Sequence, residues 1–321
     1  MQLEKVVLVG GSGFVGRAIA NRLTQAGIAL RIPTRRPERV RQMLMFPTVE
    51  VVAADVHDPA TLERLFAGAD AVVNLVGVLH SRSGTPYGPD FARAHVDLPR
   101  KIVAACQAAG VPRLIHISAL GAAHDGPSEY QRSKAAGEDA IRAAGNAPAW
   151  TILRPSVIFG RDDNFLNLFA QLASLFPVLP LAGAATRFQP VFVGDVAEVV
   201  WRCLNDAASH GQTIELAGPG VYTLRRLVEY VSELAGCPRP VFGLPEGLAM
   251  LQARLMECAP SPMMSRDNVR SMRVDNVAHG AALPFGMTPT ALEAVAPTYI
   301  GTGYLRARYP TMRGRARHHH R

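Results

Sequence analysis

Tyr130 and Lys134 are four residues apart in the segment Tyr130-Gln131-Arg132-Ser133-Lys134. In a helix, this spacing places both side chains on one face. The Lys134 ammonium can then lower the pKa of the tyrosine hydroxyl, which can exchange a proton with a substrate oxygen. Ser118, at the end of the preceding predicted strand, is expected to hold that oxygen. We therefore predict that Ser118, Tyr130 and Lys134 form a catalytic triad. The alternative for the Tyr–Lys pair is an ordinary surface contact.

A glycine-rich segment near the N-terminus, Gly10-Gly11-Ser12-Gly13-Phe14-Val15-Gly16, fits both G-x-x-G-x-x-G and G-x-G-x-x-G. It follows a predicted strand and opens a predicted helix. Glycine there permits a tight turn, close approach of backbone N–H groups to a pyrophosphate, and close packing of helix on strand. The helix N-terminus also favours the anion. We predict a dinucleotide site rather than a simple tight turn. The predicted contacts in this segment are Gly10, Ser12, Gly13, Phe14, Val15 and Gly16.

The end of the second predicted strand distinguishes the two nicotinamide dinucleotides. An NAD site usually has an acidic residue there, which binds the ribose 2′-hydroxyl. This chain has Thr34-Arg35-Arg36 instead, and its next acidic residue is Glu38. Two guanidinium groups suit a 2′-phosphate. We therefore predict that Arg35 and Arg36 favour NADP(H) over NAD(H). The alternative is that the arginines are merely solvated at the start of a helix.

Further cofactor contacts are expected at other strand ends, because ligands of open α/β sheets bind at the carboxyl ends of the strands. Asp55-Val56 follows the third predicted strand and would border the adenine. Leu75-Val76-Gly77 ends the fourth and would lie beside the ribose. Tyr130 and Lys134 complete the predicted contacts, since Lys134 can also hydrogen-bond the nicotinamide ribose.

Strand-like and helix-like segments alternate through the first 150 residues. Amphipathic stretches separate the strands and are typical of helices. They cover residues 14–26, 36–44, 59–66, 91–109 and 128–144. This alternation predicts right-handed βαβ units and an α/β fold with a Rossmann-type, doubly wound parallel sheet. The short apolar runs that are typical of strands buried on both faces cover residues 5–9, 30–33, 49–53, 71–75, 114–117 and 150–153.

After Arg154-Pro155 the segments become shorter and richer in proline and glycine. We predict a dinucleotide-binding domain over residues 1–154, to which the chain returns over 188–204 as a strand and a helix. Residues 155–305 are expected to form a smaller, mostly helical substrate or docking region. Its apolar stretch from Phe165 to Leu181 is interpreted either as a core-facing helix or as the wall of an apolar substrate cleft or a lipid-facing helix.

The glycine segment, Ser118 and Tyr130-x-x-x-Lys134 together resemble the extended short-chain dehydrogenase/reductase superfamily, which includes the NAD-dependent epimerase/dehydratase-like proteins. Within it, Phe188–Ala197 and Ser265–Val269, followed by Asp275-Asn276-Val277, are similar to the atypical branch that contains the alpha-subcomplex subunit nine of complex I. Bacterial members of that branch look most like this chain. The resemblance extends from residue 4 to residue 305 or so.

The resemblance adds expectations for two further segments. Arg154–Gly160 looks like the usual passage out of the core sheet, which implies cofactor contacts from Pro155 and Ile158. Extended members usually carry an Asn in the helix before Ser118, where it helps to relay protons. This chain has His95 there, as is usual in the atypical branch. We interpret His95 as a packing or hydrogen-bonding residue rather than an acid–base group.

These features favour an NADP(H)-dependent oxidoreductase. Its substrate would be an apolar carbonyl or alcohol, such as a quinone, a sterol or a lipid, and it would be linked to respiratory complex I or ubiquinone metabolism. The main alternative is a non-catalytic, NADPH-bound accessory or assembly protein of a respiratory complex, in which the cofactor stabilises the fold. A nucleotide-sugar epimerase or dehydratase shares the fold but fits the apolar stretch less well.

The formal charge of +8 is unevenly placed, because six arginines lie in residues 306–321. The rest of the chain is close to neutral, which argues against nucleic-acid binding. We interpret residues 306–321 either as a disordered tail or as a tether to anionic lipid or an acidic partner. Scattered cysteines indicate a reducing compartment, and no metal site is predicted. Without a recognisable signal peptide or transmembrane run, the chain is expected in the cytoplasm, with peripheral contact to the cytoplasmic membrane.

Overall fold

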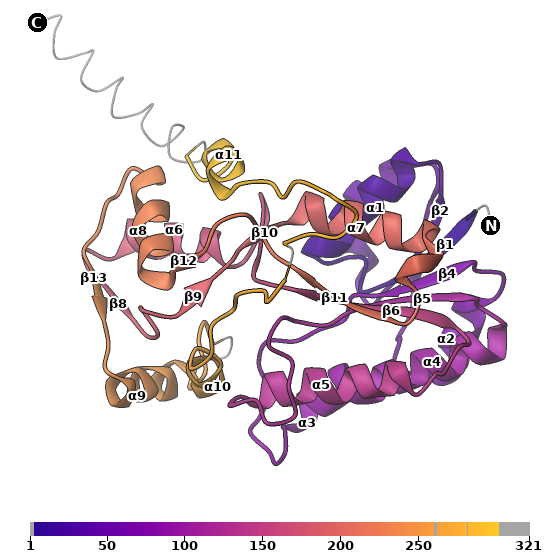
Figure 1. Ribbon diagram of the computed structural model, residues 1–321, viewed down its shortest axis with the longest axis horizontal. Coiled ribbons are helices and arrows are strands. Elements are labelled where there is room, and N and C mark those ends of the chain that lie inside the picture. The colour runs from indigo at the N-terminus through magenta and orange to yellow at the C-terminus, as the bar shows by residue number, and fades with distance from the viewer. Residues whose placement is uncertain (1–2, 260–261, 281, 302–321) are drawn as a thin grey trace, which may run out of the picture.

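A seven-stranded parallel sheet forms the centre of the computed structural model, which describes residues 3–259, 262–280 and 282–301. The basic segment 306–321 lies outside the described residues. The strand order is β11-β6-β5-β4-β1-β2-β3 (Figure 1). This order confirms the predicted α/β fold with a Rossmann-type, doubly wound sheet. The strands are β1 (Lys5–Val9), β2 (Ala29–Thr34), β3 (Val49–Ala53), β4 (Ala71–Asn74), β5 (Arg113–Ile117), β6 (Ala149–Pro155) and β11 (Gln212–Leu216).

Helices cover both faces of the sheet, because its strands are apolar on both sides. In β1, Val6 and Leu8 pack into one core cluster, whereas Val7 and Val9 pack into the other. The helices on the two faces contribute to these same clusters. One face carries α1 (Phe14–Gln25) and α7 (Val193–Asn205), and the other carries α2 (Pro59–Phe66), α4 (Leu98–Ala109) and α5 (Glu129–Arg142).

The sheet has its switch point at β1 and β4. These strands are neighbours, and the chain proceeds outward from them in opposite directions, through β2 and β3 on one side and through β5 and β6 on the other. In doubly wound sheets, ligands bind in the crevice at the carboxyl ends of the strands at this point. Because all seven strands are parallel, the segments that follow them lie along one edge of the sheet.

Two helical segments of the first half differ from their expected form. Residues 36–44 were expected to form a helix, but Pro37–Met45 (η1) is a 3-10 segment interrupted at Val40. The single helix expected over 91–109 is divided into α3 (Pro89–Phe91), a π-helical segment η2 (Ala92–Asp97) and α4. The π-helical segment brings the His95 carbonyl against Gly137 of α5, where a Cβ would collide with it.

The strand predicted over 188–193 is wrong in detail. The structure has β9 (Arg187–Phe188) and β10 (Val191–Phe192) instead, which pair with β12 (Tyr222–Thr223) and β7 (Ile158–Phe159) respectively. Pro190 separates them, and proline cannot donate to a strand ladder. Helix α7 then packs against α1. β11, which the sequence pattern did not reveal, adds the seventh strand beside β6.

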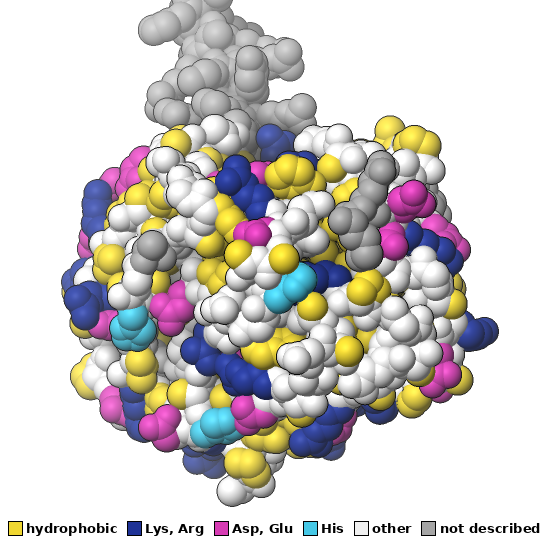
Figure 2. Space-filling view, turned by 45° about the vertical axis from the view of Figure 1, so that its right-hand side comes forward, with side chains coloured by type: hydrophobic (Ala, Val, Ile, Leu, Met, Phe, Trp, Pro, Cys, Tyr) yellow, Lys and Arg dark blue, Asp and Glu magenta, His cyan; other side chains and the backbone are white. Residues whose placement is uncertain are grey.

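The remaining elements form a smaller, mostly helical region at one end of the sheet (Figure 1). α6, α8 and α11 share an apolar cluster, and α10 contacts α9 and α5. Basic and acidic side chains are interspersed over the face shown in Figure 2. None of the helices in the described part of the chain is long and apolar enough to cross a membrane. The elements are α6 (Leu166–Leu175), β8 (Leu179–Leu181), α8 (Leu224–Leu234), β13 (Val241–Gly243), α9 (Glu246–Met256), α10 (Arg266–Ser271), α11 (Leu292–Val295) and η4 (Ala296–Thr298). The short segment η3 (Ala207–Ser209) lies instead against the central sheet, where Ser209 bonds to Arg113 of β5 and Thr151 of β6.

Candidate functional site

The turn after β1 has a conformation that requires glycine at two positions. Gly10 has a φ of +86°, a value that L side chains rarely adopt. A Cβ there would also press on the backbone at Leu75 and Val76, 3.1 Å away, so the turn lies directly against the end of β4. A Cβ at Gly16 would collide with the backbone of Gly11. Helix α1 can therefore begin in contact with the turn.

The N-terminus of α1 has no side-chain cap. Its N-cap residue is the exposed Gly13, and its first turn, Phe14–Gly16, contains no acidic residue. α2 and α5, by contrast, have side-chain caps. An uncapped helix start leaves backbone N–H groups and the positive end of the helix dipole for an anion. With Ser12 half-buried in the turn, this donor set fits a pyrophosphate group.

The strand-end residues predicted to bind the cofactor flank this turn. Arg35 and Arg36 are exposed at the end of β2. Asp55-Val56 follows β3, where the Asp55 carboxylate accepts a hydrogen bond from the His57 N–H at 3.1 Å. Leu75–Gly77 follows β4. Because β3, β2, β1 and β4 are consecutive in the sheet, these segments lie side by side along one edge.

The segment from Pro155 to Ile158 joins the same edge from β6. Pro155 ends β6 and Ile158 lies in β7. Asn276, from the C-terminal part of the chain, holds this segment: its side-chain oxygen accepts hydrogen bonds from Ser156 Oγ at 2.6 Å and from Val157 N–H at 3.0 Å. The sequence reasoning noted Asp275-Asn276-Val277 as a motif but assigned it no contact.

Tyr130 and Lys134 lie together where β4 and β5 end. The Lys134 ammonium is 5.9 Å from the centre of the Tyr130 ring. It donates a hydrogen bond to the Ile117 carbonyl at the end of β5, at 3.3 Å. Gly77, after β4, lies against the same ammonium, which would be 3.4 Å from a Cβ at that position. Tyr130 and Lys134, four residues apart on α5, therefore lie at the carboxyl ends of the strands, where the glycine turn also lies.

Burial determines the protonation of both groups. It raises the pKa of Tyr130 to about 12 and lowers the pKa of Lys134 to about 8, although the Glu138 carboxylate acts in the opposite direction on the lysine. The expected lowering of the tyrosine pKa by Lys134 is thus outweighed by burial. At neutral pH, Tyr130 is a protonated phenol and Lys134 is mostly an ammonium. This pair is suited to giving a proton to a substrate oxygen, because the cation stabilises the phenolate that remains.

His95 is a neutral, hydrogen-bonded residue, as predicted. Its Nε2 accepts the Val78 N–H at 3.0 Å, and since a backbone amide can only donate, the ring proton is on Nδ1. Nδ1 lies 2.8 Å from Ser133 Oγ, which donates to the Tyr130 carbonyl at 2.8 Å. Burial, followed by the charge of Lys134, lowers the His95 pKa to about 2. Both ring nitrogens are therefore committed to internal partners.

The Ser118 hydroxyl, predicted to hold the substrate oxygen, has an internal partner in this structure. Ser118 is only 4% exposed, and its hydroxyl donates to Glu138 at 2.6 Å. Glu138 is fully buried and also accepts hydrogen bonds from Arg154, at 2.7 and 2.6 Å, and from Arg142 at 2.7 Å. The single hydroxyl proton of Ser118 is thus directed at this carboxylate and not at a substrate oxygen. Sequence reasoning missed Glu138, although it continues the i, i+4 series of Tyr130 and Lys134.

Replacing the Glu138 carboxylate should destabilise the protein strongly. In Glu138→Ala, Arg154 and Ser118 lose their buried acceptor, and breaking a buried ion pair costs about 3–5 kcal/mol. Glu198→Ala is the matched control, because Glu198 also accepts from two arginines but is more exposed. Its expected cost is at most about 1 kcal/mol. Urea unfolding measures both, and equal losses of unfolding free energy would contradict this interpretation.

Known proteins share this architecture. The sequence matches the NAD dependent epimerase/dehydratase family over residues 6–217. The mitochondrial NADH dehydrogenase (ubiquinone) 1 alpha subcomplex subunit 9 of Mus musculus is 32% identical over 295 residues, which cover 88% of this chain and 76% of that protein. The ceramide reductase of Caulobacter vibrioides is 34% identical over 275 residues, which cover 77% of this chain and 84% of that protein.

A solved structure supports the fold. The UDP-glucuronic acid 4-epimerase of Bacillus cereus, in complex with UDP-glucuronic acid and NAD, matches with a TM-score of 0.70 over 93% of this chain and 99% of that chain, at 15% identity. The family match runs from β1 to β11 and so includes every strand of the central sheet. By its sequence match, its curated relatives and its sheet, this chain belongs to the NAD dependent epimerase/dehydratase family.

Proposed function

We propose that this protein is an NADP(H)-dependent oxidoreductase that interconverts the carbonyl and alcohol forms of an apolar substrate. The observation that carries the proposal is the placement of Tyr130 and Lys134 at the sheet edge, beside the glycine turn and the end of β4. NADPH bound along that edge would supply the hydride. The acid–base part of the reaction is assigned to residues of the chain itself.

The cofactor would be held by the residues around the switch point. The uncapped start of α1 and the turn Gly10–Gly16 fit the pyrophosphate, and Arg35 and Arg36 fit a 2′-phosphate. Asp55-Val56 would border the adenine. The nicotinamide half would be bordered by Leu75–Gly77, Pro155, Ile158, Tyr130 and Lys134.

Tyr130 would act as the proton donor during reduction. Its raised pKa of about 12 keeps the hydroxyl protonated at neutral pH. After the proton has moved to the substrate oxygen, the Lys134 ammonium stabilises the phenolate. His95 stays neutral and, through Ser133, holds the Tyr130 carbonyl in place. Ser118 is left out of this mechanism because its hydroxyl is bonded to Glu138.

An apolar substrate is supported by two observations. Leu79, in the loop after β4, is 58% exposed, and its neighbour Val78 contacts His95. The Caulobacter relative is named as a ceramide reductase, that is, as an enzyme of a lipid. The apolar helix α6 gives less support to the proposal of an apolar substrate, because its Leu166, Ala170 and Ala173 side chains face the protein core.

A second candidate function is that of a nucleotide-bound accessory protein of a respiratory complex at the cytoplasmic membrane. The name of the Mus musculus relative as a subunit of NADH dehydrogenase favours it. So does the commitment of the Ser118 hydroxyl and of both His95 nitrogens to internal partners, since these groups are withdrawn from a substrate. In this role the cofactor would stabilise the fold without being turned over.

Single-turnover oxidation of NADPH separates the two functions. With long-chain keto-lipids, quinones and a sugar-nucleotide ketone as the panel, we expect oxidation with an apolar carbonyl. In Tyr130→Phe the rate should fall by about 10²–10⁴-fold, the usual contribution of a general acid, while NADPH affinity is unchanged. Tyr222→Phe, which removes a surface hydroxyl bonded to Glu293, is the control and should behave like wild type. Tight NADPH binding without any oxidation would support the accessory role instead.

The rate of reduction should depend on the charge of Lys134. Because the lysine pKa is lowered to about 8, the ammonium is present below that pH and is lost as the pH rises through it. Tyr130 keeps its proton over the same range. We therefore expect a rate that is constant near pH 7 and falls above pH 8. In Lys134→Arg the cation persists, so the remaining activity should no longer fall there. A wild-type rate that stays level well above pH 8 would exclude this role of Lys134.

Arg35 and Arg36 should set the preference for NADPH. In the double variant Arg35→Ser/Arg36→Ser, we expect NADPH affinity to fall by about 10- to 100-fold, because hydrogen bonds between charged groups are lost, and NADH affinity to stay within about twofold. Calorimetric titration with both nucleotides measures this. Arg226→Ser, an exposed arginine of α8, is the control. An unchanged NADPH affinity in the double variant would mean that the two arginines are only solvated.

A further inference from the structure

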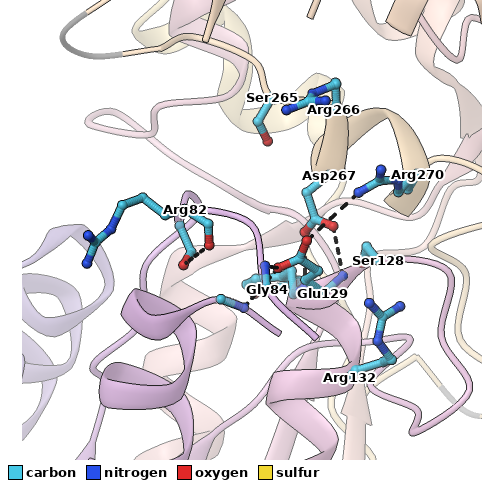
Figure 3. A network of polar contacts seen from close by, with 12 residues as sticks. Arg82, Gly84, Ser128, Glu129, Arg132, Ser265, Arg266, Asp267 and Arg270 are labelled. Carbon is cyan, nitrogen blue, oxygen red and sulfur yellow. Dashed lines mark hydrogen bonds and ion pairs between the residues drawn. The ribbon is translucent and has the colours of Figure 1, made fainter. Parts of the chain in front are cut away.

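A residue of the C-terminal region holds the N-terminus of α5, the helix that carries Tyr130 and Lys134. Asp267, in the first turn of α10, accepts two hydrogen bonds from backbone amides of α5 (Figure 3). Its Oδ1 accepts the Glu129 N–H at 2.7 Å, and its Oδ2 accepts the Tyr130 N–H at 3.0 Å. Asp267 is 9% exposed, so water competes little for these bonds.

The contact completes the cap of α5. The first N–H groups of a helix have no partner within the helix and need one from outside. Ser128 is the N-cap, and its hydroxyl accepts the Gln131 N–H at 3.1 Å. Asp267 accepts hydrogen bonds from the two preceding amides, those of Glu129 and Tyr130, so all three N–H groups of the first turn are bonded. The negative charge of Asp267 also lies where the helix dipole favours it.

A second carboxylate, that of Glu129, binds the loop that contains Gly84 and Gly88 to the N-terminus of α5. Glu129, the first residue of α5, accepts the Gly84 N–H at 3.0 Å and the Gly88 N–H at 2.8 Å. Its other oxygen lies 3.9 Å from Arg270 of α10. Figure 3 shows the loop, the start of α5 and α10 converging on these side chains. Glu129 thus connects the loop to the start of α5 and to α10.

Asp267 is itself held firmly on the side of α10. A capping box between Ser265 and Asn268 closes the first turn of this helix. Arg266 donates to Glu257, the C-cap residue that follows α9, from its backbone N–H at 2.7 Å and from its guanidinium at 2.8 Å. The carboxylate is thus presented from a rigid element and not from a loose surface loop.

Both backbone polar groups of Tyr130 are consequently fixed by named partners. Asp267 binds its N–H from the C-terminal region, whereas Ser133, held by His95, binds its carbonyl from within the sheet domain. The Tyr130 side chain starts from the backbone between these two points. The position of the Tyr130 side chain in the site therefore depends on how α10 packs against α5.

We propose that Asp267 is a positioning residue. It caps α5 at the Tyr130 amide, so the position of the Tyr130 hydroxyl depends on how the C-terminal region packs against α5. This inference rests on the proposed role of Tyr130 in proton transfer. Asp267 acts through the backbone and contacts neither the cofactor nor the substrate.

Asp267→Asn tests the proposal, because it keeps the shape but removes the charge and turns one acceptor into a donor facing an N–H group. We expect kcat to fall by about 10- to 100-fold, as small misplacements of reacting groups do, while KM and NADPH affinity stay within about twofold. Asp267→Glu, which restores the charge, should recover part of kcat. A loss of NADPH affinity with kcat retained would overturn the proposal.

The titration of Tyr130 provides a readout that needs no turnover. Once the ring is no longer held in its half-buried position, its pKa should fall from about 12 toward the ordinary value of about 10. The tyrosinate absorbance of Asp267→Asn minus that of Asp267→Asn/Tyr130→Phe isolates this residue. If the wild type turns out not to oxidise NADPH with any substrate, the proposed function fails but this titration still tests the positioning.

Asp70→Asn is the matched control. Asp70 accepts hydrogen bonds from the consecutive amides of Glu4 and Lys5, both at 2.8 Å, at the opposite end of the sheet. Asp70 thus makes the same kind of hydrogen bonds as Asp267, from a carboxylate to two consecutive backbone amides, but these amides do not belong to α5. This variant should lose stability with kcat and the Tyr130 titration unchanged. If Asp267→Asn behaves in the same way, Asp267 is merely structural and the proposal is overturned.

Discussion

The burial of charged groups on α5 is the constraint on which the arrangement of the site depends. Lys134 and Glu138 are 5% and 0% exposed, and a buried charge without a partner costs several kcal/mol. The fold therefore has to supply Arg154 and Arg142 to the carboxylate and the Ile117 carbonyl to the ammonium. These partners come from β5, from β6 and from α5 itself. They can all be satisfied only when α5 lies at one position on the sheet, and that position brings Tyr130 to the carboxyl ends of the strands.

The same constraint explains the protonation states around the site. The low dielectric that lowers the Lys134 pKa to about 8 also lowers the pKa of His95 to about 2 and of His116 to about 3. Both histidines are neutral as a result, and the charge beside Tyr130 is that of Lys134. The same buried carboxylate of Glu138 also accepts the hydrogen bond that the Ser118 hydroxyl donates. Stability and chemistry thus compete for the same polar groups.

The relatives show why fold alone does not decide function. One is named as a subunit of NADH dehydrogenase and another as a reductase of ceramide, at similar identity to this chain. The sheet edge serves a bound nucleotide equally well in either role. In this chain the Ser118 hydroxyl and both ring nitrogens of His95 have internal hydrogen-bond partners.

Features that depend on neighbours along the chain could be predicted from the amino-acid pattern alone. The apolar runs predicted the buried parallel strands, glycine spacing predicted the turn after β1, and the i and i+4 spacing placed Tyr130 beside Lys134. Only the tertiary structure decided the partners of these groups. Four contacts are examples: Glu138 with Ser118, Asp267 with the start of α5, Asn276 with the segment after Pro155, and β11 with β6. They join residues that are between 20 and 138 positions apart. Local spacing carries no information about such contacts, because they form only once the sheet brings its strand ends together and buried polar groups must find whatever partners lie within reach.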